Sequence, residues 1–251
     1  MHINRYEHIR TASTTSHFAQ RLWDSGQSLL AAGRYVAARR ELEAAEHQAF
    51  LRHNAVLLAG IYLPLLEAVR QIRQLCCNGI IAIIAADQTS RRHVVLELAT
   101  SGGVWLELET GRRSTTRSCG KLLAVADVPF EFLRLSLVAS HWYVTAHGDQ
   151  HLGIPVIWTT DPGHLIAPAA PENMVAILPP PGIYRPGDPQ HAQARETLFL
   201  VWEALALGWL GRRHRQCDGW EALAILRQAR KIDPACERIL MQMMALAESL
   251  I

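Results

Sequence analysis

The sequence predicts an α+β protein in which N- and C-terminal helical hairpins pack together around an inserted, mostly antiparallel β domain. Near both ends of the 251-residue chain, apolar residues recur every three to four positions, the period of an amphipathic helix. Between residues 79 and 160 the period changes to two, the alternation of a half-buried strand. These periods divide the chain into a helical part at 1–77, a β-rich domain at 78–160, a Pro/Gly-rich loop at 161–191 and a second helical part at 192–251.

Three helices are predicted in the N-terminal part. Ser16 has the side chain of a helix N-cap, and the first helix runs from there to a break at Gly33-Arg34-Tyr35. A second helix follows this break. Asn54 is expected to cap a third helix that extends to residue 77, and Pro64 inside this helix predicts a kink or a break.

The middle zone predicts seven short strands connected by tight turns. They are expected at residues 80–85, 94–98, 104–108, 121–128, 132–138, 142–146 and 152–158. Ser101-Gly102-Gly103 is expected to join the second strand to the third. The Pro/Gly-rich loop that follows contains one further edge strand, at 174–178, and a loop of this length is usually a lid, a binding loop or a linker.

The helical period returns in the C-terminal part, with helices predicted at 197–210, 219–232 and 235–250. Within this part, the run Arg212 to Arg215 is expected to be a solvated turn between two helices.

Charge and cysteine usage exclude several classes of protein. The 25 basic and 23 acidic residues are too balanced for binding to nucleic acid or to a membrane surface by bulk electrostatics. The N-terminus lacks the apolar core of a signal peptide, and no uncharged apolar run approaches the ~20 residues of a membrane span. Five cysteines without a CxxC pair favour a reducing compartment. We therefore expect a cytoplasmic protein without a cofactor.

The first hairpin resembles a tetratricopeptide repeat. The residues that carry the resemblance alternate large and small side chains in the order of that family: Leu22, Gly26, Leu29, Gly33, Tyr35, Ala38, Leu42 and Ala45. Small residues at these positions let two antiparallel helices approach closely, and Tyr35 would fill the wedge between them. The resemblance implies a helical surface that binds another protein or peptide.

The C-terminal hairpin repeats only the second half of this pattern. Ala222, Leu226, Ala229 and the closing Pro234 match, whereas Gly208 and Gly211 are out of register. Two repeats, about 34 residues at each end, are fewer than the ~3 that a solenoid needs. We therefore expect both ends to form one helical layer, with an unrelated pair of alanine-rich hairpins as the alternative.

The candidates for metal binding are concentrated between residues 141 and 164. Four histidines and two carboxylates lie there, and such side chains can ligate zinc or iron: His141, His147, Asp149, His151, Asp161 and His164. Gly148-Asp149 reads as a two-residue hairpin turn, which would direct His147 and His151 to opposite faces of the ribbon. We therefore predict no metal site in this stretch.

No catalytic constellation assembles from the other motifs. Cys119 lies between Arg117 and Lys121, which could lower the pKa of its thiol, but no base accompanies it. The sequence contains no GxSxG, P-loop or GxGxxG motif.

The sequence favours a non-catalytic interaction or adaptor protein over an enzyme. If the repeat resemblance holds, the inner surface of the first helix presents the partner-binding residues Gln20, Trp23, Gln27 and Leu30. One alternative is an enzyme or small-molecule binder with a site between the β domain and the Pro-rich loop, lined by Asp161, His164, Tyr184 and Arg185. A second alternative is a structural subunit that associates through the apolar face of its last helix, with itself or with another chain.

Overall fold

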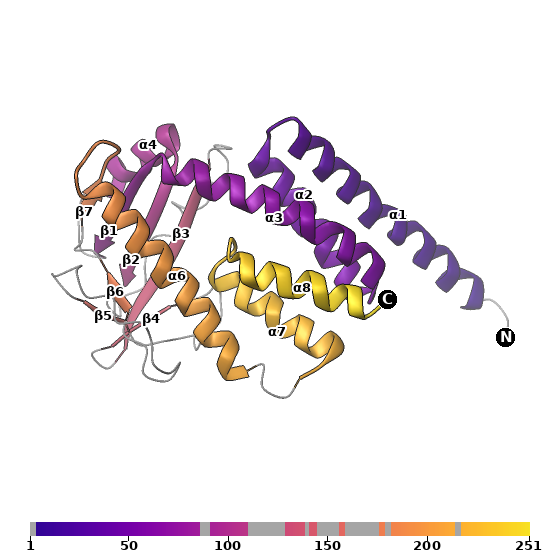
Figure 1. Cartoon of the computed structure of the whole chain (residues 1–251). Coiled ribbons are helices and arrows are strands. Elements are labelled where there is room, and N and C mark those ends of the chain that lie inside the picture. Colours follow the sequence, from indigo (N-terminus) through magenta and orange to yellow (C-terminus); the bar gives the residue numbers. More distant parts are fainter. Residues whose placement is uncertain are drawn as a thin grey trace. The chain divides into compact units, whose positions relative to one another are not determined.

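The computed structural model describes residues 4–85, 91–109, 129–138, 141–144, 156–158, 176–178, 182–213 and 217–251. The chain forms two units: unit 1 comprises Met1–Gln71 and Leu240–Ile251, and unit 2 comprises Ile72–Ile239. The chain passes between the units inside two helices, at residues 71–72 and 239–240. Figure 1 labels the elements of both units.

Unit 1 begins with two long helices, α1 (Asn4–Ala31) and α2 (Tyr35–Leu51), which pack as a hairpin (Figure 1). The connection is short because α1 ends in a Schellman motif. The N–H of Arg34 bonds to the carbonyl of Leu29 at 2.9 Å, and the N–H of Gly33 bonds to that of Leu30 at 3.0 Å. Gly33 has a φ of 73°, a left-handed conformation that glycine adopts without steric cost.

Small residues bring α1 and α2 close together. Ala38, Leu42 and Ala45 are fully buried on α2. On α1, Gly26 lies directly over Leu42, so that a Cβ atom on Gly26 would come within 2.6 Å of the Leu42 Cγ. The hairpin thus depends on the absence of a side chain at residue 26.

Helix α3 (Ala55–Cys77) completes the N-terminal helical set, and its first part, to Gln71, belongs to unit 1. The Asn54 side chain accepts a hydrogen bond from the N–H of Leu57 at 3.0 Å, which confirms the predicted cap. The helix continues through Pro64, so of the two predicted alternatives, a kink or a break, the break is wrong. Two contacts anchor α3 in the unit: the Trp23 ring packs on Gly60, and the Tyr62 hydroxyl donates to the buried Glu46 carboxylate at 3.3 Å.

Among the described residues, α3 is the one helix long and apolar enough to cross a membrane by length and composition alone. Its apolar stripe is buried within the fold, as expected for a core helix. Leu58, Ile61, Leu65 and Val69 are at most 1% exposed.

The described residues of unit 2 form a seven-stranded mixed sheet with the order β6-β5-β4-β3-β2-β1-β7. The strands are β1 (Ile80–Ala85), β2 (Gly103–Glu109), β3 (Phe130–Val138), β4 (His141–Val144), β5 (Val156–Trp158), β6 (Ala176–Leu178) and β7 (Gly182–Tyr184). β1 pairs in parallel with β2, β2 with β3, and β5 with β6. The antiparallel pairs are β1 with β7, β3 with β4, and β4 with β5.

Helix α4 (Arg91–Ser101) connects β1 to β2 and packs on one face of the sheet. Ile80, Ala82 and Ile84 point to this face and form a buried cluster with Val94 and Leu98 of α4. Ile81 and Ile83 point to the opposite face and are also fully buried. β1 is therefore covered on both faces, which explains its uninterrupted apolar sequence.

Three further helices follow the sheet: α6 (His191–Arg213), α7 (Gly219–Ile232) and α8 (Glu237–Ser249). α6 crosses in front of the strands in Figure 1 and contacts β1 and β6. Its first residue, His191, is buried and lies with Nε2 2.9 Å from the carbonyl oxygen of Gly79, which ties the start of α6 to the start of β1. α7 packs against α6 in unit 2, and α8 passes into unit 1.

The predicted α+β class is confirmed, whereas the prediction of a mostly antiparallel sheet is wrong. The error arose at residues 94–98, which form the middle of α4 and not a strand. A strand would place residues 94, 96 and 98 on one face, but the structure buries Val94 and Leu98 and exposes Leu96, which is the pattern of a helix. A helical crossover of this kind makes the two strands that it joins parallel.

Other predicted boundaries also need correction. Ser16 lies inside α1, which begins at Asn4, so it is not an N-cap. Residues 182–184, predicted as part of the Pro/Gly-rich loop, form the edge strand β7, and α6 begins at His191 rather than at residue 197. Of the strand predicted at 142–146 the structure describes β4 (His141–Val144), and of the strand predicted at 152–158 it describes β5 (Val156–Trp158). The strand predicted at 121–128 lies outside the described residues.

Replacing Gly26 by valine is expected to lower the free energy of unfolding by about 1–3 kcal/mol, because its side chain would overpack against the buried Leu42. Urea unfolding followed by circular dichroism measures this change. The neighbouring Ser25→Val variant is the control, because Ser25 is exposed on the same helix and should cost less than about 0.5 kcal/mol. Equal losses in the two variants would contradict the proposed close approach.

Candidate functional site

A surface groove in unit 1 lies where α2 turns into α3, and we call it the turn groove. It has a volume of about 510 Å³, within the range of ligand-binding pockets. Ten residues line it: Ala19, Ala49, Arg52, His53, Asn54, Ala55, Val56, Leu57, Leu250 and Ile251.

The geometry of this turn follows from local backbone chemistry. α2 ends in a second Schellman motif, in which the N–H of Asn54 bonds to the Ala49 carbonyl and that of His53 to the Phe50 carbonyl, both at 3.0 Å. His53 takes the left-handed position with a φ of 52°, which is uncommon for a residue with a side chain. Asn54 then caps α3. This compact turn fixes the backbone that carries Arg52 and His53 at the rim of the groove.

Arg52 is the one arginine or lysine among the residues that line the turn groove. Arg52 is exposed, and within the described part of the chain no hydrogen bond or ion pair engages its guanidinium. No acidic side chain is among the lining residues. Most of the other lining residues are alanines or larger aliphatic residues.

Of the exposed aliphatic side chains of unit 1, Val56 lines the groove, Leu51 directly precedes Arg52 in the chain, and Leu63 lies further along α3. Leu51 is 62% exposed, Val56 65% and Leu63 61%. Val56 and Leu63 are seven residues apart and thus lie on the same side of α3. Among the described residues, most large apolar side chains that are exposed belong to unit 1: Phe18, Leu51, Val56, Leu63, Met241 and Ile251. Single exposed apolar residues are ordinary, but a group of them indicates a surface that another molecule covers.

The predicted partner-binding residues occupy different environments on α1. Gln27 is exposed and Leu30 is half-buried. Gln20 donates a hydrogen bond to the Asp24 carboxylate at 3.0 Å. Trp23 packs its ring on Gly60 of α3, and its indole N–H is buried with no hydrogen-bond partner among the described residues. Trp23 therefore packs between α1 and α3, and only part of its side chain is accessible to a partner.

The residues of the alternative ligand site are only partly described. Asp161 and His164 lie outside the described residues. Tyr184 is buried in β7, and Arg185 forms a two-bond ion pair with Glu97 of α4 at 2.7 and 3.0 Å. Tyr184 and Arg185 are neighbours in the chain, and no described contact joins their side chains in a common site. The carboxylate that binds Arg185 belongs to Glu97 of α4 and not to a residue of the Pro/Gly-rich loop.

The described residues contain no group of three or more metal-ligating side chains. Of the predicted histidine cluster, His141 opens β4, whereas His147, Asp149, His151, Asp161 and His164 lie outside the described residues, as does Cys119.

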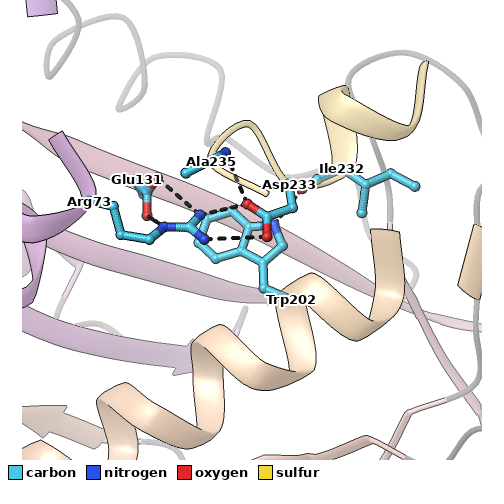
Figure 2. Close-up of polar contacts among 6 residues, drawn as sticks. All are labelled: Arg73, Glu131, Trp202, Ile232, Asp233 and Ala235. Carbon is cyan, nitrogen blue, oxygen red and sulfur yellow. Dashed lines mark hydrogen bonds and ion pairs between the residues drawn. The ribbon is translucent and has the colours of Figure 1, made fainter. Parts of the chain in front are cut away.

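Unit 2 contains a buried ionic cluster that the sequence analysis did not identify (Figure 2). Arg73 of α3 donates two hydrogen bonds to the Glu131 carboxylate of β3, at 3.0 and 3.1 Å. It donates two more to the Asp233 carboxylate after α7, at 2.6 and 3.3 Å. Glu131 and Asp233 are buried. We call Arg73, Glu131 and Asp233 the Arg73 cluster.

Aromatic rings and backbone groups complete the surroundings of the Arg73 cluster. The guanidinium lies 4.7 Å from the ring centre of Phe199 and 5.2 Å from that of Trp202, both on α6. Trp202 donates its indole N–H to the Ile232 carbonyl, and Asp233 accepts a further bond from the N–H of Ala235 at 3.1 Å (Figure 2). Burial by itself lowers the pKa of Arg73, but the charges of Glu131 and Asp233 outweigh it and raise the pKa above its ordinary value.

The Arg73 cluster is a structural element rather than a reactive one. The guanidinium already bonds through all three of its nitrogens, so little capacity remains for a substrate. The sequence contains one signal for it: Arg73 interrupts the apolar stripe of α3 between Val69 and Cys76. A charge within a buried stripe requires a buried partner, although periodicity does not reveal which one.

The described thiols are not activated nucleophiles. Burial raises the pKa of Cys76 and of Cys77, and it raises the pKa of Cys236 to about 12. The pKa of Cys217 is also raised, by desolvation and then by Glu221. Because the thiolate is the reactive form, raised pKa values oppose nucleophilic and redox roles at these positions.

No protein-family model, no curated protein and no solved structure matches this chain.

Replacing Arg73 by methionine should lower the free energy of unfolding by about 3–5 kcal/mol, because two buried carboxylates would lose their counter-charge. Arg70→Met, on the same helix, is the control, since Arg70 forms an exposed ion pair with Glu67 that should contribute less than about 1 kcal/mol. Urea unfolding of both variants at pH 7 gives the comparison. A similar small loss in both would show that the Arg73 cluster does not stabilise the fold.

Stability should fall as the pH rises above about 8.5, the ordinary pKa of a thiol in an unfolded chain. The folded protein holds the proton of Cys236 up to a pKa of about 12. This contribution is therefore complete below pH 8.5 and is lost progressively towards pH 12. Urea unfolding at pH 8 and pH 10.5 should show a smaller alkaline loss for Cys236→Ala than for the natural chain. An identical loss in both proteins would refute the assignment.

Proposed function

We propose that the protein is a non-catalytic interaction or adaptor protein that binds another protein or peptide through the helical surface of unit 1. The observation that carries this proposal is the exposure of three large aliphatic side chains in unit 1, Leu51, Val56 and Leu63, of which Val56 lines the turn groove. Covering apolar surface contributes about 25 cal/mol per Å². Three large side chains that are each more than three-fifths exposed can thus supply a useful part of the free energy of binding.

The resemblance to tetratricopeptide repeats supports the same proposal. In unit 1, Gly26 and the buried Ala38 and Ala45 allow α1 and α2 to pack closely, which is the role that small residues have in such repeats. Helices of this family bind protein partners, and we propose the same use for α1, α2 and the first part of α3. Gln27 and Leu30, both at least partly accessible on α1, would extend the binding surface.

We also propose that the two helical ends form one layer that carries this surface. The inclusion of Leu240–Ile251 with Met1–Gln71 in unit 1 supports this arrangement for the end of α8. Leu250 and Ile251 contribute to the lining of the turn groove. The last turn of the chain would then help to shape the binding surface formed by the N-terminal helices.

The chemistry of the described residues supports binding over catalysis. Among the described residues, the Arg73 cluster is a dense group of ionisable side chains, and its guanidinium already bonds through all three of its nitrogens. We propose that the partner is another protein in the cytoplasm, with neither nucleic acid nor membrane as a ligand. The near balance of 25 basic and 23 acidic residues supports this choice.

Native mass spectrometry on tagged protein isolated gently from its source cells tests the proposal. We expect a partner of fixed stoichiometry with the natural chain and its loss in the Val56→Ser, Leu63→Ser double variant, because both side chains belong to the exposed surface. Leu96→Ser is the matched control, since Leu96 is 67% exposed in unit 2 and should retain the partner.

Two results would contradict the proposal. One is a protein that carries no partner under any gentle isolation. The other is a partner that stays bound to the double variant and is released by Leu96→Ser, which would place the interaction in unit 2.

A further inference from the structure

We draw no further inference here: the strongest candidate, the mainly apolar turn groove of unit 1 with the exposed Val56 in its lining, carries none because nothing in the structure shows what covers it.

Discussion

The four hydrogen bonds of the Arg73 guanidinium connect elements of unit 2 that are far apart in the sequence. They join α3 to β3 and to the turn after α7 (Figure 2). The rings of Phe199 and Trp202 on α6 lie near the same cation. The cluster lies close in sequence to both places where the chain passes between the units. Arg73 lies two residues beyond the crossing in α3, and Asp233 lies shortly before α8. Because its charges are buried, replacing any one of the three residues should strongly destabilise unit 2.

Unit 1 is organised in a different way, by small side chains rather than by charge. Gly26 and the alanines of α2 allow the helices to approach, and Trp23 fills the space beside Gly60 of α3. Leu51, Val56 and Leu63 are exposed in the same unit, and their exposure is the reason to propose a binding function for it.

Sequence patterns predicted the helices of unit 1 better than the topology of unit 2. The cap by Asn54, the buried stripe of α2 and the end of α1 at Gly33 follow from local rules, and the structure shows all three. Residues 94–98 misled the analysis because Val94, Leu96 and Leu98 also fit an alternating pattern. That single misreading removed the crossover helix, and with it the parallel pairing of β1 with β2.

The sequence by itself determined the α+β class, the strands β1 and β2, and the amphipathic helices at both ends, because each depends on the period of nearby residues. Only the tertiary structure decided which strands are neighbours, which charges are buried in the Arg73 cluster, and that the Trp23 ring packs on Gly60. It also brought Ala19, Arg52 and Leu250 to one groove. These relations join residues tens to hundreds of positions apart, and no local period records the contacts between them.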